Sequence, residues 1–198
     1  MNASPYTEVD AYGTSGAGPV WVESLGGPLI VVPVSALTAW HGATETGLVG
    51  GDATAPDDYD RACAVGGLAG VIPVGQGGAQ ALVLADEPAT TCYLPEHRAF
   101  LRWFAARSAA GLRAAAEAAL ADPATSWEEC GTWVSDGTGV LMDSVEAGAG
   151  LDSEAPGGGM PEQAPVPLPA GRWRVRATHT GPGGENQAGL VQLLPAEG

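Results

Sequence analysis

Histidine and cysteine, the residue types that most often bind metals or act as nucleophiles and bases, are few in this chain and widely spaced. The three histidines, His41, His97 and His179, lie in different thirds of the 198 residues, and none has a histidine or cysteine three or four positions away, the spacing of a helical zinc pair. Cys92 could act as a nucleophile with His97 or His179 only if the fold brings them together. We therefore predict no catalytic residue, no metal site and no bound cofactor.

The glycine-rich segments do not indicate nucleotide binding either. The segment 75–78 lacks the last glycine of a dinucleotide-binding fingerprint, and it leads into a strand-like run instead of a helix. A phosphate-binding P-loop needs a lysine, and all eight cationic residues of this chain are arginines.

Acidic side chains dominate the charge of the protein. The 23 Asp and Glu residues outnumber the 8 Arg, which gives a formal net charge of −15. Nucleic acid is disfavoured as a partner, because proteins bind it mainly by neutralising phosphates with their own cations. Residues 1–60 contain eight acids and no cation, and such a region attracts basic protein surfaces. The alternative, that the acids only keep the protein soluble, stays open.

Two acidic clusters and one tryptophan are the candidate contacts for a basic partner. The cluster at 57–60 lacks the spaced ligand series of a calcium loop, because Arg61 and Ala62 interrupt it. Trp40 adjoins a loop, where an aromatic side chain can serve as a contact hot spot. The candidate partner-binding residues are Asp57, Asp58, Asp60, Glu128, Glu129 and Trp40.

Short apolar runs bounded by glycine and proline predict antiparallel strands that would position these residues. We expect two strands at 21–22 and 29–32 joined by a turn, a short helical segment after Pro33, a hairpin of 68–74 and 81–84, a strand at 90–94, a hairpin of 127–134 and 139–142, and strands at 173–177 and 188–194. Arg172, Arg174 and Arg176 alternate with apolar residues, so they should share the wet face of one strand. They could bind phosphate there, but the net negative charge of the chain favours pairing with its surplus carboxylates.

Residues 96 to about 121 predict one long amphipathic helix. At 100° per residue, Phe100, Leu101, Phe104 and Leu112 fall on one side. The charged residues fall on another; these are Arg98, Arg102, Arg113 and Glu117. Pro123 disfavours a helical residue before it and ends the helix. The expected fold class is α+β, with mostly antiparallel sheet and this helix packed on one face.

The chain length predicts a single domain at 19–198 after a disordered lead-in at 1–18. Residues 143–167 contain nine glycines and prolines, a composition that predicts a flexible, acidic insertion. No apolar run is long enough to span a bilayer, and the N-terminal residues lack the pattern of a secretory signal. Together with the odd number of cysteines, this favours the cytoplasm and no membrane partner.

Several ordered segments are similar to one known family. The segments are WVESLGGPLIVVP at 21–33, WHG at 40–42, DYDRACAVGGLAGVIPVG at 58–75, ALVLADEPATTCYLP at 81–95, WEECGTW at 127–133 and PLPAGRWRVRAT at 167–178. Over about residues 20–195 the chain resembles the immunity protein 21 family of bacterial polymorphic toxin systems. The resemblance implies a cytoplasmic protein that binds and neutralises a cognate toxin domain by steric and electrostatic blocking, and it brings no catalytic or binding residues with it. Many such toxins are nucleases with cationic clefts, so a basic toxin is the expected partner.

Two alternatives remain at this point. One is a small-molecule enzyme that uses Cys92 or a histidine, which a deep pocket joining Cys92 to His97 or His179 would support. The other is a structural interaction module without a toxin partner, which an exposed apolar patch in place of an acidic one would indicate.

Overall fold

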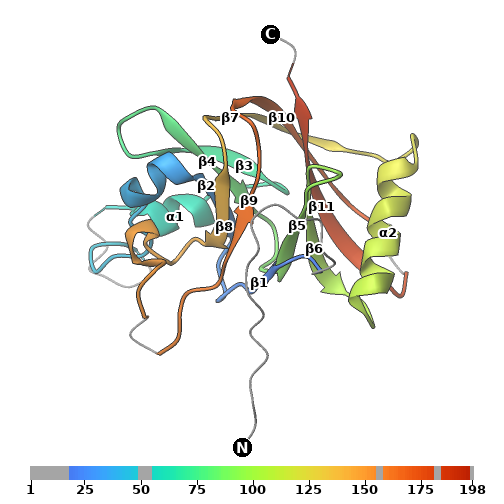
Figure 1. Cartoon of the computed structure of the whole chain (residues 1–198), viewed down its shortest axis with the longest axis horizontal. Coiled ribbons are helices and arrows are strands. Elements are labelled where there is room, and N and C mark those ends of the chain that lie inside the picture. Colours follow the sequence, from blue (N-terminus) through green and yellow to red (C-terminus); the bar gives the residue numbers. More distant parts are fainter. Residues whose placement is uncertain (1–17, 49–54, 155–157, 181–183, 197–198) are drawn as a thin grey trace, which may run out of the picture.

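Two antiparallel sheets pack face to face at the centre of the protein (Figure 1). The computed structural model describes residues 18–48, 55–154, 158–180 and 184–196. The larger sheet has the strand order β1-β5-β6-β11-β10-β7, and the smaller sheet has the order β3-β4-β2-β8-β9. The predicted, mostly antiparallel architecture is therefore confirmed.

The strands have the following bounds. In the larger sheet they are Trp21–Val22 (β1), Thr91–Leu94 (β5), Ala99–Ala105 (β6), Gln187–Pro195 (β11), Gly171–His179 (β10) and Glu128–Ser135 (β7). In the smaller sheet they are Gly70–Val74 (β3), Ala79–Leu84 (β4), Leu29–Pro33 (β2), Gly139–Asp143 (β8) and Gln163–Val166 (β9).

Short helices cover the outer face of the smaller sheet, and one longer helix covers part of the larger sheet (Figure 1). The first group comprises α1 (Asp58–Cys63) and the 3₁₀ helices Val34–Ala39 and Gly148–Gly150, and the longer helix is α2 (Ala109–Ala121). Strand β2 is buried at every position because of this layering. Leu29 and Val31 enter the core between the sheets, whereas Ile30 and Val32 enter the outer cluster beneath the short helices.

The long helix predicted for residues 96–121 is wrong in its first half. The helix begins at Ala109, and residues 99–105 form strand β6. Phe100 lies in the core between the sheets, and Leu101 lies in the cluster under α2. A strand buried on both faces has apolar residues at successive positions, and this spacing resembles one side of a helix. Arg102, expected on a polar helix face, is only 2% exposed.

The two strands predicted at 21–22 and 29–32, and the two strands of the hairpin predicted at 127–142, belong to different sheets. β1 pairs with β5, whereas β2 pairs with β4 and β8, so the turn at 23–28 crosses from one sheet to the other. β7 pairs with β10, whereas β8 pairs with β2 and β9, so the turn at 135–138 also changes sheet. The hairpin of β3 and β4 and the strands β5, β10 and β11 are confirmed.

The predicted insertion at 143–167 contains ordered elements. The 3₁₀ helix Gly148–Gly150 and strand β9 both lie within it, and β9 pairs with β8. Its flexibility stays a prediction, and the predicted lead-in at 1–18 lies outside the described residues except for Gly18. Among the described helices, none has the length and apolar character needed to cross a membrane.

Candidate functional site

The carboxylates of the 57–60 cluster hold the local backbone in place. Asp57 caps α1: its side chain accepts hydrogen bonds from the backbone N–H groups of Asp60 (2.9 Å) and Thr44 (2.6 Å). Asp60 accepts in return from the N–H groups of Asp57 (3.1 Å) and Leu48 (2.6 Å). Burial raises the pKa of Asp57, but these hydrogen bonds outweigh it and leave the pKa below its ordinary value.

Asp58 is also used within the protein. Its carboxylate accepts a hydrogen bond from the N–H of His41 (2.7 Å) and forms an ion pair with Arg61. Asp58 and Asp60 are 8% and 7% exposed, so little of either side chain reaches the surface. The structure therefore gives the cluster a capping role, and reversing its charges would disrupt α1 before it tested partner binding.

Trp40 is fully buried, so the prediction that it is a surface contact is wrong. Its indole N–H donates to the carbonyl of Ser144 (3.2 Å), and its ring packs in the cluster under the short helices. The adjoining loop folds over this side chain because a tryptophan ring contributes a large apolar area to a core.

Glu128 and Glu129 are exposed and lie on β7 of the larger sheet. Glu128 accepts a hydrogen bond from the N–H of Leu68 (3.1 Å). Glu129 forms a two-pronged ion pair with Arg174, and this hydrogen bonding lowers the pKa of Glu129. The expected pairing of the β10 arginines is thus confirmed for Arg174, while Arg176 stacks over the ring of Trp127 at 4.1 Å.

Cys92 does not fit the role of a nucleophile. It is fully buried, and burial raises its pKa to about 12, so the side chain is a neutral thiol at physiological pH. His179 pairs with Asp86 at 2.8 Å, and His97 lies 4.0 Å from Glu96. Within the described part of the chain, no group of three or more His, Cys, Asp or Glu side chains is placed to hold a metal ion.

Positive charge is confined almost entirely to the side of the larger sheet. Seven of the eight arginines lie on its strands, its connecting turns or α2; these are Arg98, Arg102, Arg107, Arg113, Arg172, Arg174 and Arg176. Arg61 lies on the side of the smaller sheet and is already paired with Asp58. The carboxylates around the smaller sheet therefore have few cations to neutralise them.

An acidic groove of about 210 Å³ lies at one end of the smaller sheet. The pairing register explains how distant residues meet there: Leu29 at the start of β2 faces Asp143 at the end of β8, and Met142 faces Gln163 at the start of β9. The segments that precede β2, follow β8 and precede β9 therefore converge. They line the groove with Glu23, Leu25, Asp143, Glu146, Gly158, Gly159, Met160, Pro161 and Glu162.

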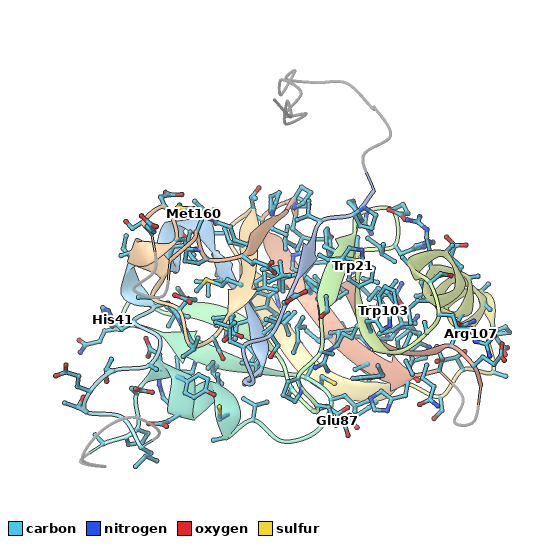
Figure 2. All side chains as sticks on the ribbon, turned by 90° about the horizontal axis from the view of Figure 1, so that it is seen from below. Trp21, His41, Glu87, Trp103, Arg107 and Met160 are labelled. Atoms are coloured by element: carbon cyan, nitrogen blue, oxygen red, sulfur yellow. The ribbon has the colours of Figure 1, made fainter. Side chains whose placement is uncertain are left out.

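Two hydrogen bonds fix the β1–β2 connection against the other segments of the groove. Glu162 accepts from the N–H of Glu23 (2.7 Å), and Asp143 accepts from the N–H of Leu25 (2.6 Å). Figure 2 shows Met160 at the margin of the molecule, on the opposite side of that view from Glu87. In the described residues, none of the four groove carboxylates forms an ion pair.

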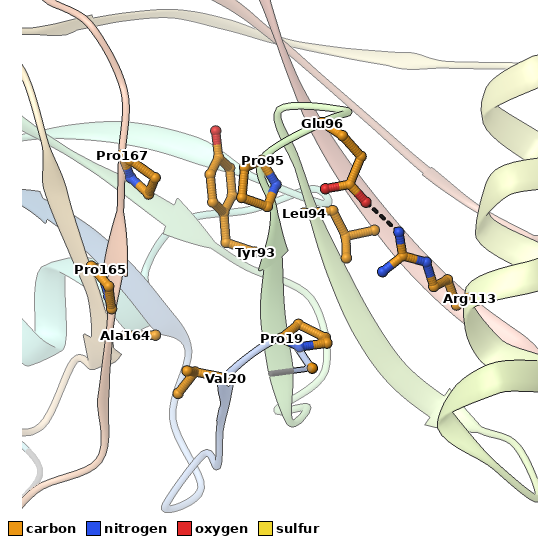
Figure 3. Close-up of a pocket in the computed structure, with 11 residues that line it drawn as sticks. Pro19, Val20, Tyr93, Leu94, Pro95, Glu96, Arg113, Ala164, Pro165 and Pro167 are labelled. Carbon is orange, nitrogen blue, oxygen red and sulfur yellow. Dashed lines mark hydrogen bonds and ion pairs between the residues drawn. The ribbon is translucent and has the colours of Figure 1, made fainter. Parts of the chain in front are cut away.

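A second cavity, of about 400 Å³, differs from the groove in its charge (Figure 3). Its walls are mostly apolar and include Pro19, Pro95 and Pro165. Its carboxylate, Glu96, is neutralised by an ion pair with Arg113, drawn as the dashed line in Figure 3. The acidic groove is therefore the better candidate for contact with a basic partner.

Sequence reasoning missed most of the groove. Glu23 was recognised only as one of the eight acids of residues 1–60, and the other groove residues come from segments that the sequence does not place side by side. A signal for Glu146 and Glu162 lay in the acidic character of 143–167, but their position depends on the strand order of the smaller sheet.

The fold is a two-sheet domain whose charge is separated between the sheets and whose acidic side carries a groove. The family model of immunity protein 21 matches residues 20–186, so the chain belongs to the immunity protein 21 family. Comparison with curated proteins and with solved structures gave no match.

Proposed function

We propose that this chain is an immunity protein that binds a cognate toxin domain in the cytoplasm and blocks it without catalysing a reaction. Family membership carries this proposal, because immunity proteins protect the cell that makes the toxin. The neutral, buried thiol of Cys92 adds support, since it removes the nucleophile that the enzyme alternative needs.

The charge separation supports a basic toxin, such as a nuclease with a cationic cleft. Long-range attraction between an acidic inhibitor and a basic target accelerates association, and complementary contacts then fix the complex. The carboxylates near the smaller sheet are suited to attracting a basic toxin, because Arg61, the arginine on that side, is already paired with Asp58. The inhibitor would cover the cleft and exclude the toxin's substrate.

Co-expression tests the proposal directly. The toxin domain encoded beside this chain is produced in a susceptible bacterium with wild-type protein, with empty vector, or with an unrelated acidic protein. Growth restored only by the wild-type chain, together with co-purification of the two proteins, is the expected result. Growth arrest in all three strains would refute the proposal.

A further inference from the structure

The groove at the end of the smaller sheet has apolar side chains that are exposed to solvent. Leu25 is 72% exposed and Met160 is 56% exposed, and both line the same groove. Large apolar side chains that remain exposed beside a concavity are typical of protein interaction sites. Methionine suits such a surface because its flexible thioether adapts to different partners.

The polar side chains of the groove all have one sign of charge. Glu23, Glu146 and Glu162 accompany Leu25 and Met160, and Asp143 adds a fourth carboxyl group. In the described chain, every ion pair that an arginine or a histidine forms is made with an acid outside the groove. Carboxylates that share a site repel one another, so a cation that enters the groove relieves this repulsion.

Asp143 is the most deeply buried carboxylate of the groove. The residue is only 3% exposed, and its carboxylate accepts hydrogen bonds from two backbone N–H groups, those of Leu25 and Val145. Buried carboxylates in proteins are usually paired with a cation, and this one has no such partner among the described residues. Burial raises the pKa of Asp143, and the hydrogen bonds from the N–H groups of Val145 and Leu25 offset only part of this shift.

We infer that the groove receives one arginine or lysine side chain of the toxin. The aliphatic stem packs between Leu25 and Met160, and the charged head lies among the carboxylates of Glu146 and Glu162 near Asp143. A volume of about 210 Å³ suits one long side chain. Arginine fits best, because its planar guanidinium donates to two carboxylates at once.

This inference rests on the proposed function and is tested with the toxin domain that rescues growth in co-expression. The test variant is Glu146→Gln with Glu162→Gln, which removes two charges but keeps the shape of the groove. The control variant, Glu45→Gln with Glu87→Gln, removes two exposed carboxylates outside the groove and gives the same net charge. Both pairs change the net charge by the same amount, so faster dissociation of the groove variant alone reports the groove.

Dissociation and association rates of the complex are measured for both variants by surface plasmon resonance. We expect the groove variant to dissociate about tenfold faster or more, as for the loss of partly desolvated charge pairs, and the control to change by less than about threefold. Alanine substitution of the toxin's arginines and lysines should identify one position whose effect disappears in the groove variant.

The outcomes separate the two proposals. If the toxin binds wild-type protein and both variants equally, the groove is not the contact, although the immunity function stands. If no arginine or lysine substitution in the toxin loses its effect in the groove variant, the assigned chemistry is wrong. Absence of any binding to the wild-type chain would overturn both.

Discussion

Asp57 and Asp60 together accept hydrogen bonds from four backbone N–H groups, of Thr44, Leu48, Asp57 and Asp60. Sequence reasoning recognised this cluster by its charge and assigned it to partner binding. The sequence also contains a helix-capping pattern here, because an aspartate followed three positions later by another acid resembles a capping box before a helix. Charge density alone does not distinguish a carboxylate that faces solvent from one that holds a loop.

Replacing Asp57 by alanine removes the cap of α1. The free energy of unfolding should fall by about 1–2 kcal/mol, the usual cost of losing an N-cap side chain. Asp152→Ala is the matched control, because Asp152 is exposed and should change stability by less than about 0.5 kcal/mol. Urea denaturation of both variants measures the difference, and equal effects would show that the cap does not stabilise the protein.

The stability loss of Asp57→Ala should depend on pH. Because the folded-state pKa of Asp57 lies below its ordinary value of about 4, the contribution of this carboxylate is complete above about pH 5 and is lost as the pH falls through the lowered pKa. The difference between wild-type and variant should therefore be constant above about pH 5 and shrink in acid. A difference that persists unchanged in acid would contradict this role of the ionised carboxylate.

Arg102 is a buried cation that holds the connection between β4 and β5. Its guanidinium donates to the carbonyls of Ala85 and Glu87, and burial lowers its pKa to about 10. Arg102→Met keeps most of the apolar volume but leaves these carbonyls without donors, so we expect a loss of about 2–4 kcal/mol. Arg107→Met, at an exposed ion pair, should cost less than about 0.5 kcal/mol. Thermal and urea unfolding measure the free energy of unfolding of both variants. Similar losses would refute this role of Arg102.

At the scale of elements, the sequence predicts the strands better than their partners. Apolar runs at 68–74, 81–84 and 188–194 were enough to find β3, β4 and β11. The turn at 135–138 resembles a hairpin turn, yet Trp133 and Leu141 on either side of it belong to opposite sheets and meet in one core. Local turn signals do not determine which sheet a strand joins, because that choice depends on contacts distant in sequence.

The start of α2 shows a second limit of predicting elements from the sequence. The alanine-rich part of 96–121 forms the predicted helix, but the aromatic-rich part forms β6, where two sheet neighbours and two covered faces outweigh helix propensity. Ser108 caps the helix by accepting a hydrogen bond from the N–H of Gly111 (3.1 Å). This serine was available in the sequence as a helix start signal.

The two 3₁₀ helices approach so closely that one glycine is required. A Cβ atom at Gly148 would overlap the carbonyl of Leu37, whereas a Cβ at Gly150 would meet nothing. Gly148→Ala should therefore lower the free energy of unfolding by about 2–3 kcal/mol. Gly150→Ala, in the same short helix, should be neutral or slightly stabilising. Equal melting temperatures for the two variants would show that this packing is looser than described.

For the whole molecule, composition predicted an acidic protein but not where the carboxylates that no arginine neutralises lie. Sheet order puts nearly all of the arginines on one side, where Glu96, Glu117, Glu129 and Glu185 neutralise several of them. The groove forms on the other side because three sequence-distant segments meet at one end of the smaller sheet. A linear sequence contains the charges, but their separation is a property of the fold.

The salt dependence of association tests the central claim that the acidic side of this protein attracts a basic toxin. The association rate constant of wild-type protein and purified toxin domain is measured by stopped-flow fluorescence between about 50 and 300 mM salt. We predict a fall of about tenfold or more across this range, because screening removes the long-range attraction. An association rate that is constant or increases with salt would contradict the account.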